Sequence, residues 1–243
     1  MYVLITGSNG GIGRALTEAF ASSGYNIIAH ELNESNPHTE FLKSIEQQYN
    51  VSVRPTYFDL TNSEEMKAEV RKLIKDKVDI DVLVNCAGIA HGGLFQMTSM
   101  DTIRKVFDIN FFSMMELTQL LLRPMVRRKS GCIINFSSIS GLDSKAGNCA
   151  YGTSKAAVIA WTKTLASELA PLGIRVNAIA PGLTDTNMAK QMEDKAGAAM
   201  ISDSAMNRLG RPEEIANVAL FLASDKASFV NGQVIRVDGG STK

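Results

Sequence analysis

The sequence predicts an α/β fold in which a doubly wound parallel sheet of about seven strands carries helices on both faces. Short runs rich in aliphatic and β-branched residues recur along the chain, and longer helical stretches separate them. Most of these runs are continuously apolar rather than alternating, which is typical of parallel strands covered on both faces. The regular alternation of strand and helix favours right-handed crossovers within one sheet.

The elements follow one another from the first residues to the last. The predicted strands are 2–6, 25–29, 51–58, 80–85, 132–136, 174–179 and 233–237. The run at 51–58 is the weakest of these, because Pro55 has no N–H to donate to a ladder. The helices predicted between the strands are 12–23, 37–49, 63–76, 100–129, 152–170 and 212–223.

The chain of 243 residues is expected to form one domain, 1–243, since its composition does not change along its length. One region, 183–211, interrupts the alternation: it contains Met, Ala and Gly and has no clear strand. Between the last two strands, it would lie at the carboxyl edge of the sheet, where ligands bind in such folds. It is a candidate substrate lid, with a mobile surface loop as the alternative.

The composition argues against several classes of function. Lys plus Arg and Asp plus Glu each number 25, so neither a nucleic-acid partner nor a polybasic membrane patch is expected. No apolar run approaches the roughly 20 residues of a membrane span, and a glycine-rich loop follows the first run, so no signal peptide is expected either. The three scattered cysteines, Cys86, Cys132 and Cys149, indicate reduced thiols in the cytoplasm and no metal site.

A glycine-rich loop joins the first strand to the first helix. Gly7, Gly11 and Gly13 have the spacing G-x-x-x-G-x-G in the stretch LITGSNGGIGRAL. Such a turn brings backbone N–H groups close to a pyrophosphate, which the helix N-terminus also attracts. The strand before and the helix after it support a dinucleotide site over a glycine-rich turn without a ligand.

Glu31 follows the second predicted strand, 18 residues after Gly13. An acidic side chain at about this place can accept hydrogen bonds from an adenosine ribose, and it repels a 2′-phosphate. Neither Gly10 nor Leu32 offers a positive charge for such a phosphate. The cofactor is therefore NAD or NADP, with NAD favoured; an exposed glutamate at a strand end is the alternative.

Tyr151 and Lys155 stand four residues apart in the stretch NCAYGTSKAAVIAWTKTLASELA, so they share one face of a helix. A tyrosine can give a proton to the oxygen of a carbonyl group during its reduction. Two charges about 4 Å apart interact by up to ~4 kcal/mol, so the lysine is expected to lower the pKa of the tyrosine. Taken alone the pair is unspecific, since the same spacing also arises by chance.

Seven motifs in order make the chain resemble the short-chain dehydrogenase/reductase family, in its branch of about 250 residues. They are TGSNGGIG (6–13), FDLT (58–61), NCAG (85–88), IN (109–110), INFSSISG (134–141), YGTSK (151–155) and APG (180–182). Cys86 replaces the second Asn of the family's NNAG. The closing segments RLGRPEEIA and VNGQVIRVDGG look most like those of 3-oxoacyl-[acyl-carrier-protein] reductases.

This resemblance implies a Rossmann fold and a catalytic set of Asn110, Ser138, Tyr151 and Lys155. Tyr151 would be the general acid or base, and Ser138 would hydrogen-bond the substrate oxygen. Lys155 would also hold the nicotinamide ribose, and Asn110 would kink its helix and bind a water that links Lys155 to solvent. The implied cofactor-binding residues are Gly7, Ser8, Asn9, Gly11, Ile12, Gly13, Glu31, Asp59, Leu60, Asn85, Ala87, Gly88, Tyr151, Lys155, Pro181, Gly182, Thr184 and Thr186.

The expected function is that of an NAD(P)-dependent oxidoreductase that interconverts a carbonyl and a secondary alcohol, with a 3-oxoacyl thioester as one candidate substrate. A dehydrogenase of a sugar, a steroid or another small alcohol is an alternative, and a non-catalytic dinucleotide-binding regulator is another. The resemblance implies a homotetramer. An acyl carrier protein could meet the basic residues 127–129, but the segment APLG at 170–173 offers no second charge.

Overall fold

The computed structural model of the protein describes residues 1–143, 145–186 and 204–241. Its sheet has seven strands in the order β3-β2-β1-β4-β5-β6-β7, and every neighbouring pair is parallel. The strands are β1 (Tyr2–Thr6), β2 (Asn26–Glu31), β3 (Val53–Tyr57), β4 (Ile80–Asn85), β5 (Gly131–Phe136), β6 (Ile174–Pro181) and β7 (Val234–Val237). The predicted doubly wound sheet is confirmed.

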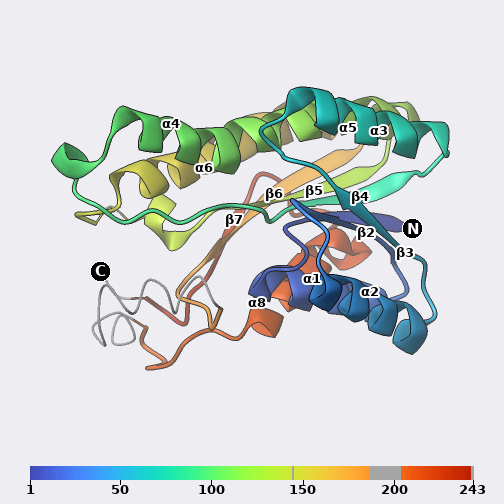
Figure 1. Ribbon diagram of the computed structural model, residues 1–243, viewed down its shortest axis with the longest axis horizontal. Coiled ribbons are helices and arrows are strands. Elements are labelled where there is room, and N and C mark those ends of the chain that lie inside the picture. The colour runs from blue at the N-terminus through green and yellow to red at the C-terminus, as the bar shows by residue number, and fades with distance from the viewer. Residues whose placement is uncertain (144, 187–203, 242–243) are drawn as a thin grey trace.

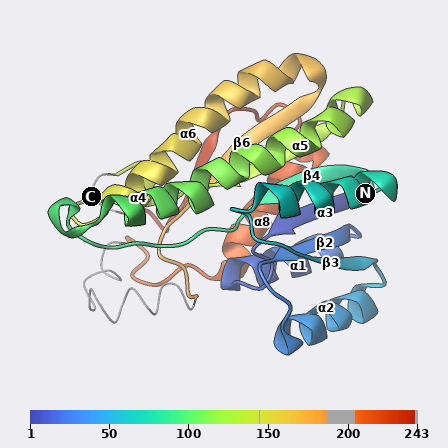
Figure 2. The ribbon, with the colours of Figure 1, turned by 45° about the horizontal axis from the view of Figure 1, so that its top comes forward.

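Helices cover both faces of the sheet, as Figures 1 and 2 show. The α-helices are α1 (Gly11–Ser22), α2 (Asn36–Tyr49), α3 (Ser63–Lys75), α4 (Met100–Phe107), α5 (Ser113–Arg128), α6 (Cys149–Leu169) and α8 (Pro212–Ala223). Shorter helical turns are η1 (Phe95–Met97), η2 (Asp108–Phe112), η3 (Ile139–Gly141), η4 (Ala170–Leu172) and η6 (Asp225–Ala227). Helices α1, α2 and α8 form one outer layer, and α3, α5 and α6 form the other.

Successive strand residues feed two apolar cores, because side chains alternate between the faces of a sheet. On β2, Ile27 packs into the core under α1, α2 and α8, whereas Ile28 packs into the core under α3, α5 and α6. Both side chains are fully buried, as are Phe20 on α1 and Leu117 on α5. This double burial explains why the predicted strands are continuously apolar.

Two predicted elements differ from the structure in instructive ways. The strand predicted at 51–58 shortens to β3, where Pro55 is tolerated because β3 pairs only with β2 at the edge of the sheet. The single helix predicted at 100–129 is α4 and α5 joined by a π-helical turn, η2, around Asn110. Amphipathic periodicity runs through such a turn, so the sequence pattern does not reveal it.

Strand order reverses beside β1, with β2 on one side and β4 on the other. In open α/β sheets the crevice at such a point, outside the carboxyl ends of the strands, is where ligands bind. Of the predicted lid, residues 187–203 lie outside the described residues. Its two flanks are anchored: Gly210 donates to the Leu183 carbonyl (2.9 Å), and the Ala205 N–H donates to the Gly240 carbonyl (3.3 Å). Within the described ranges, none of the helices has the length and apolar character needed to cross a membrane.

Candidate active site

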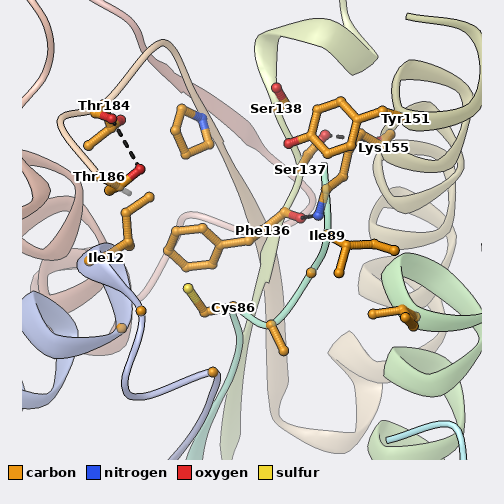
Figure 3. Close-up of a pocket in the computed structure, with 18 of the residues that line it drawn as sticks. Ile12, Cys86, Ile89, Phe136, Ser137, Ser138, Tyr151, Lys155, Thr184 and Thr186 are labelled. Atoms are coloured by element: carbon orange, nitrogen blue, oxygen red, sulfur yellow. Dashed lines mark hydrogen bonds between the residues drawn. The ribbon is translucent and has the colours of Figure 1, made fainter. Parts of the chain in front are cut away.

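A cavity of about 550 Å³ lies at the carboxyl ends of the strands, and this volume suits a small-molecule or cofactor site. In Figure 3, Tyr151, Ser138 and Lys155 lie on one side of it, with Thr184 and Thr186 across from them. Most of the predicted site residues line it: Gly7, Asn9, Gly11, Ile12, Gly13, Glu31, Asp59, Leu60, Ala87, Gly88, Ser138, Tyr151, Lys155, Pro181, Gly182, Thr184 and Thr186.

Two positions of the glycine loop, Gly11 and Gly13, are packed so tightly that a side chain is excluded there. A Cβ at Gly13 would overlap the carbonyl oxygen of Gly7, and a Cβ at Gly11 would lie 2.6 Å from Cγ2 of Thr186. Gly7 has a φ of +68°, a conformation that glycine adopts at low cost. The loop thus presents bare backbone at the start of α1, which is the cradle that a dinucleotide pyrophosphate requires.

The Glu31 carboxylate lies at the end of β2, beside the glycine loop. It accepts hydrogen bonds from the N–H groups of Leu32 (2.9 Å) and Asn9 (3.3 Å), so it is tied to the glycine loop. Nearby, the Asp59 carboxylate accepts from the Thr61 N–H at 2.8 Å, beside the cavity. Two fixed carboxylates therefore face the end of the cavity that an adenosine would occupy.

Three predicted site residues face inward instead of lining the cavity. The Ser8 hydroxyl donates to the His30 carbonyl (3.0 Å), and the Asn85 amide donates to Oδ1 of Asn135 (2.9 Å). Both side chains are buried, and they fix the glycine loop and the end of β4. Asn110 is the third, and its surroundings connect it to the catalytic side of the cavity.

Asn110 lies in the π-helical turn η2 and is fully buried. Its Oδ1 accepts from the Ile89 N–H (2.8 Å), and its Nδ2 donates to the Ile89 carbonyl (2.9 Å) and to the Ser154 hydroxyl (3.2 Å). A Cβ at Gly88 would lie 3.0 Å from Oδ1 of Asn110 and 3.4 Å from Nζ of Lys155. The π-helical turn η2 lies where the kink was expected, and Asn110 joins the loop after β4 to helix α6.

Ser138 is held on α6 by a close backbone contact. A Cβ at Gly141 would lie 2.6 Å from the carbonyl carbon of Lys155, and a Cβ at Gly152 would lie 2.7 Å from the Ser140 carbonyl oxygen. The Ser137 hydroxyl also donates to the Lys155 carbonyl at 2.9 Å. These contacts bring the turn that starts at Ser138 against the same helical turn that carries Tyr151 and Lys155.

Burial is the largest cause of the pKa shifts of Tyr151 and Lys155. Burial raises the pKa of the Tyr151 phenol, and a hydrogen bond with Ser138 opposes that shift. Burial lowers the pKa of Lys155 to about 8. The lysine Nζ donates to the Phe136 carbonyl (2.8 Å) and lies 5.9 Å from the centre of the tyrosine ring.

The expectation that Lys155 lowers the pKa of Tyr151 is therefore wrong for this arrangement. Desolvation of a buried phenol disfavours the phenolate, and the ammonium is directed at a backbone carbonyl rather than at the hydroxyl. What lowers the pKa of the phenol here is the Ser138 hydrogen bond.

Several residues that line the cavity were not among the predicted site residues. They include Cys86, Ile89, Phe136, Ser140 and Asn148. Burial raises the pKa of the Cys86 thiol to about 12, so this thiol is an inert wall rather than a nucleophile. Their common signal is position, since each lies at or beyond the carboxyl end of a strand, or caps the start of α6. Among the described residues, no cluster of His, Cys, Asp or Glu could hold a metal ion.

Comparison with known proteins extends over almost the whole chain. A family model described as enoyl-(acyl carrier protein) reductase matches residues 7–242. The 3-oxoacyl-[acyl-carrier-protein] reductase FabG of Thermotoga maritima is 39% identical, over 98% of this chain and 96% of its own length. An uncharacterized oxidoreductase of Bacillus subtilis, YmfI, is 36% identical, over 98% of this chain and 97% of its own.

A solved structure has the same fold as well. The crystal structure of gox2181 matches with a TM-score of 0.92 and 33% identity, and the match covers 98% of this chain and 94% of that one. Together with the glycine cradle and the Ser138, Tyr151 and Lys155 cluster, these matches leave one family. The chain belongs to the short-chain dehydrogenases/reductases, and it is an oxidoreductase that interconverts a carbonyl and a secondary alcohol with a nicotinamide dinucleotide.

Proposed function

We propose that the chain reduces a 3-oxoacyl thioester to the 3-hydroxyacyl thioester in this cavity. The observation that carries the proposal is the pair of hydroxyl-bearing residues, Ser138 and Tyr151, which together line one end of a cavity large enough for a dinucleotide. The names of several relatives, such as that of Thermotoga maritima, support the 3-oxoacyl substrate.

A nicotinamide dinucleotide held in this cavity would supply a hydride to the carbonyl carbon of the substrate. The glycine loop at Gly7, Gly11 and Gly13 holds the pyrophosphate on backbone N–H groups at the start of α1. Lys155, which lines the cavity, holds the nicotinamide ribose. Ile12, Thr184 and the other lining residues exclude water around the reacting centre.

Ser138 and Tyr151 act on the substrate oxygen. Both hydroxyls donate hydrogen bonds to the oxygen as negative charge develops there, and Tyr151 passes its proton to it. The raised pKa of Tyr151 keeps the phenol protonated before the reaction, which suits a general acid. A proton from solvent would then return to the tyrosine by way of Lys155, through a water held beside Asn110.

The description of the matching family model favours a second candidate, the reduction of an enoyl thioester. In that reaction the hydride goes to a carbon–carbon double bond, and the oxygen of the thioester, rather than a ketone, carries the developing charge. Two hydroxyls directed at one oxygen fit a ketone better, because the proton has to end on that oxygen. The assay below includes both substrates.

We infer a preference for NADH over NADPH. The carboxylate of Glu31 is fixed by Asn9 and Leu32 at the nucleotide end of the cavity. A 2′-phosphate placed there would meet a negative charge, whereas ribose hydroxyls would find an acceptor.

The acyl group is proposed to arrive on coenzyme A or another small thiol rather than to require a carrier protein. Of the basic cluster at 127–129, Arg128 is already paired: it donates to Asp79 (2.7 Å) and lies 4.0 Å from Asp81. The segment Ala170–Leu172 and Gly173 adds no charge. Acetoacetyl carrier protein as a second substrate tests this choice.

A homotetramer is proposed from exposed apolar side chains at two places. Phe112 and Met100, at η2 and α4, are about half exposed, and Phe229, before β7, is fully exposed. Four copies of the 26.3 kDa chain would cover both places. Light scattering after size exclusion tests the mass. The free thiols of Cys86, Cys132 and Cys149 fit a reducing cytoplasm, which we propose as the location.

The experiment is a set of turnover assays with acetoacetyl-CoA and crotonyl-CoA, each with NADH and with NADPH. We expect oxidation of NADH with acetoacetyl-CoA, lost in Tyr151→Phe, and no turnover of crotonyl-CoA. Turnover of crotonyl-CoA alone would establish the enoyl reductase instead. Cofactor binding without turnover of either thioester would refute the thioester substrate and lead to sugars and small alcohols.

A further inference from the structure

One arginine of the edge strand β7 is held between two carboxylates. Arg236 donates from Nη1 and Nη2 to the two oxygens of Asp143 (3.2 and 2.8 Å), and from Nε to Asp238 (2.9 Å). The Asp143 side chain is only 14% exposed and that of Asp238 only 7%. Bidentate arginine–carboxylate pairs fix orientation as well as distance, so this contact is stiffer than an ordinary surface pair.

The first carboxylate belongs to the turn that begins at Ser138. The Ser138 hydroxyl accepts from the Ser140 N–H (3.1 Å), and the Asp143 N–H donates to the Ile139 carbonyl (2.7 Å). Asp143 therefore ends a compact turn whose first residue presents the hydroxyl at the cavity. A displacement of Asp143 therefore also displaces Ser138, because only a few covalent and hydrogen bonds separate the two residues.

The second carboxylate belongs to the segment that supports the cofactor side. The Gly182 N–H donates to the Val237 carbonyl (2.9 Å), and a Cβ at Gly182 would lie 2.7 Å from the Cα of Asp238. Residues 204–206 contact the same segment, where the Ser204 hydroxyl donates to the Gly239 carbonyl (3.1 Å). Gly182 lines the cavity, so Arg236 bridges two of its walls.

We propose that Arg236 is a positioning residue that fixes the Ser138 turn relative to the Gly182 loop. The two segments are far apart in sequence and come from different strand ends, β5 and β6. The β6 end is supported by β7, an edge strand that has a neighbour on one side only. Arg236 connects that edge to the turn, and so sets the distance between the hydroxyl that holds the substrate oxygen and the loop beside the cofactor.

This inference rests on the proposed function for its kinetic test. In Arg236→Gln and in Asp143→Asn, kcat for acetoacetyl-CoA should fall about tenfold, since a displacement below 1 Å costs less than the 100-fold of a full ångström. The Kd for NADH and the KM should stay within about twofold, because Ser138 acts in the transition state. The double variant should be no slower than the slower single variant, because both changes break the Arg236–Asp143 contact and only Arg236→Gln also breaks the contact with Asp238.

The matched control is Arg54→Gln, which breaks the Arg54–Asp76 pair (2.7 Å) far from the cavity with an equally exposed arginine. Its kcat should equal that of the wild type. Arg236→Lys, which keeps the charge but not the fork, should recover part of the lost rate. An unchanged kcat in Arg236→Gln, or an equal fall in Arg54→Gln, overturns the proposal.

Amide hydrogen exchange separates this proposal from the choice of substrate. The N–H groups of Ser140 and Asp143 should exchange faster in Arg236→Gln than in the wild type and in Arg54→Gln, with no substrate present. If the wild type turns over no thioester while this difference appears, the proposed function fails and the positioning role of Arg236 stands. If the N–H groups of the turn exchange at the same rate in all three proteins, the positioning role of Arg236 is refuted whatever the substrate.

Discussion

The two ends of the cavity recognise their ligands with different parts of the polypeptide. At the nucleotide end the surface is largely backbone, with glycines at positions 7, 11 and 13 and two fixed carboxylates, Glu31 and Asp59. At the catalytic end the surface is made of side-chain heads, Ser138, Tyr151 and Lys155, and burial shifts the pKa of the last two.

This difference determines how each end fails. The nucleotide end depends on glycines that have no side chain, so it should be sensitive to the addition of a Cβ atom. The catalytic end works through a few polar atoms that face the substrate, so it should be sensitive to their removal. Substitutions that delete one oxygen and substitutions that add one carbon therefore test the comparison directly.

The largest effect is expected for Tyr151→Phe, which deletes the phenolic oxygen and little else. A general acid contributes about 10²- to 10⁴-fold to a rate, so kcat should fall by a factor in this range. The Kd for NADH, measured by fluorescence, should change by no more than a few-fold, because the ring still fills its place.

A control for this change is Tyr49→Phe, which removes an exposed hydroxyl that donates to Glu18 at the surface. It should leave both kcat and Kd as they are in the wild type. Full activity of Tyr151→Phe would remove Tyr151 from the mechanism and with it the assignment of the catalytic end.

At the nucleotide end, Gly13→Ala should do the opposite and remove binding. The added Cβ overlaps the carbonyl oxygen of Gly7, and overpacking of this kind costs about 1–3 kcal/mol or more, which is about 5- to 150-fold or more in Kd if it falls on the bound state. Gly10→Ala in the same loop is the control, because Gly10 has a φ of −68° and its Cβ would make an ordinary contact at 3.4 Å. Equal Kd values for NADH in the two variants would contradict the account of the cradle.

The buried ammonium of Lys155 should make stability depend on pH at the catalytic end. Burial lowers its pKa from 10.5 to about 8, so between these values the unfolded chain binds a proton that the folded chain does not. Stability therefore rises with pH through this window, by on the order of 1–3 kcal/mol relative to Lys155→Met, which lacks the titrating group.

Urea unfolding at pH 7.5 to 10.5 measures this difference. Cys86 and Cys132, whose pKa values burial raises to about 12 and about 11, work in the other direction above pH 9, but both proteins contain them. Lys163→Met, which removes an exposed lysine from the same helix, should follow the wild-type curve. Parallel curves for the wild type and Lys155→Met would show that this lysine is not desolvated.

How far the sequence predicts the molecule also differs between the two ends. The sheet and the glycine loop follow from local pattern, since apolar runs and glycine spacing are properties of neighbouring residues. Ser138, Tyr151 and Lys155 were found by family resemblance, because no local rule joins a serine at a strand end to a helix. The pKa shift of Tyr151 was predicted in the wrong direction, since sequence spacing does not report burial.

Contacts between distant residues account for the rest. Arg236 and Asp143 are 93 positions apart, and no periodicity predicts that they meet. The π-helical turn at Asn110 cannot be read from the sequence for a related reason. The hydrogen bonds of the Asn110 side-chain amide are made with Ile89 and Ser154, which lie on other elements. Such features depend on the assembled fold, so only the structure could supply them.

The smallest effect is expected at Glu31, the side chain at the nucleotide end to which we assign the choice between NADH and NADPH. Glu31→Ala removes a charge that would repel a 2′-phosphate, so the preference for NADH over NADPH should fall about tenfold in kcat/KM, as exposed charges interact weakly in water. Glu34→Ala, which removes an exposed charge three residues away, should leave the ratio unchanged. Glu31→Gln keeps an acceptor for the Asn9 and Leu32 N–H groups, so it separates charge from loop geometry. A ratio that Glu31→Ala changes and Glu31→Gln does not would mean that the carboxylate orders the loop rather than selects the cofactor.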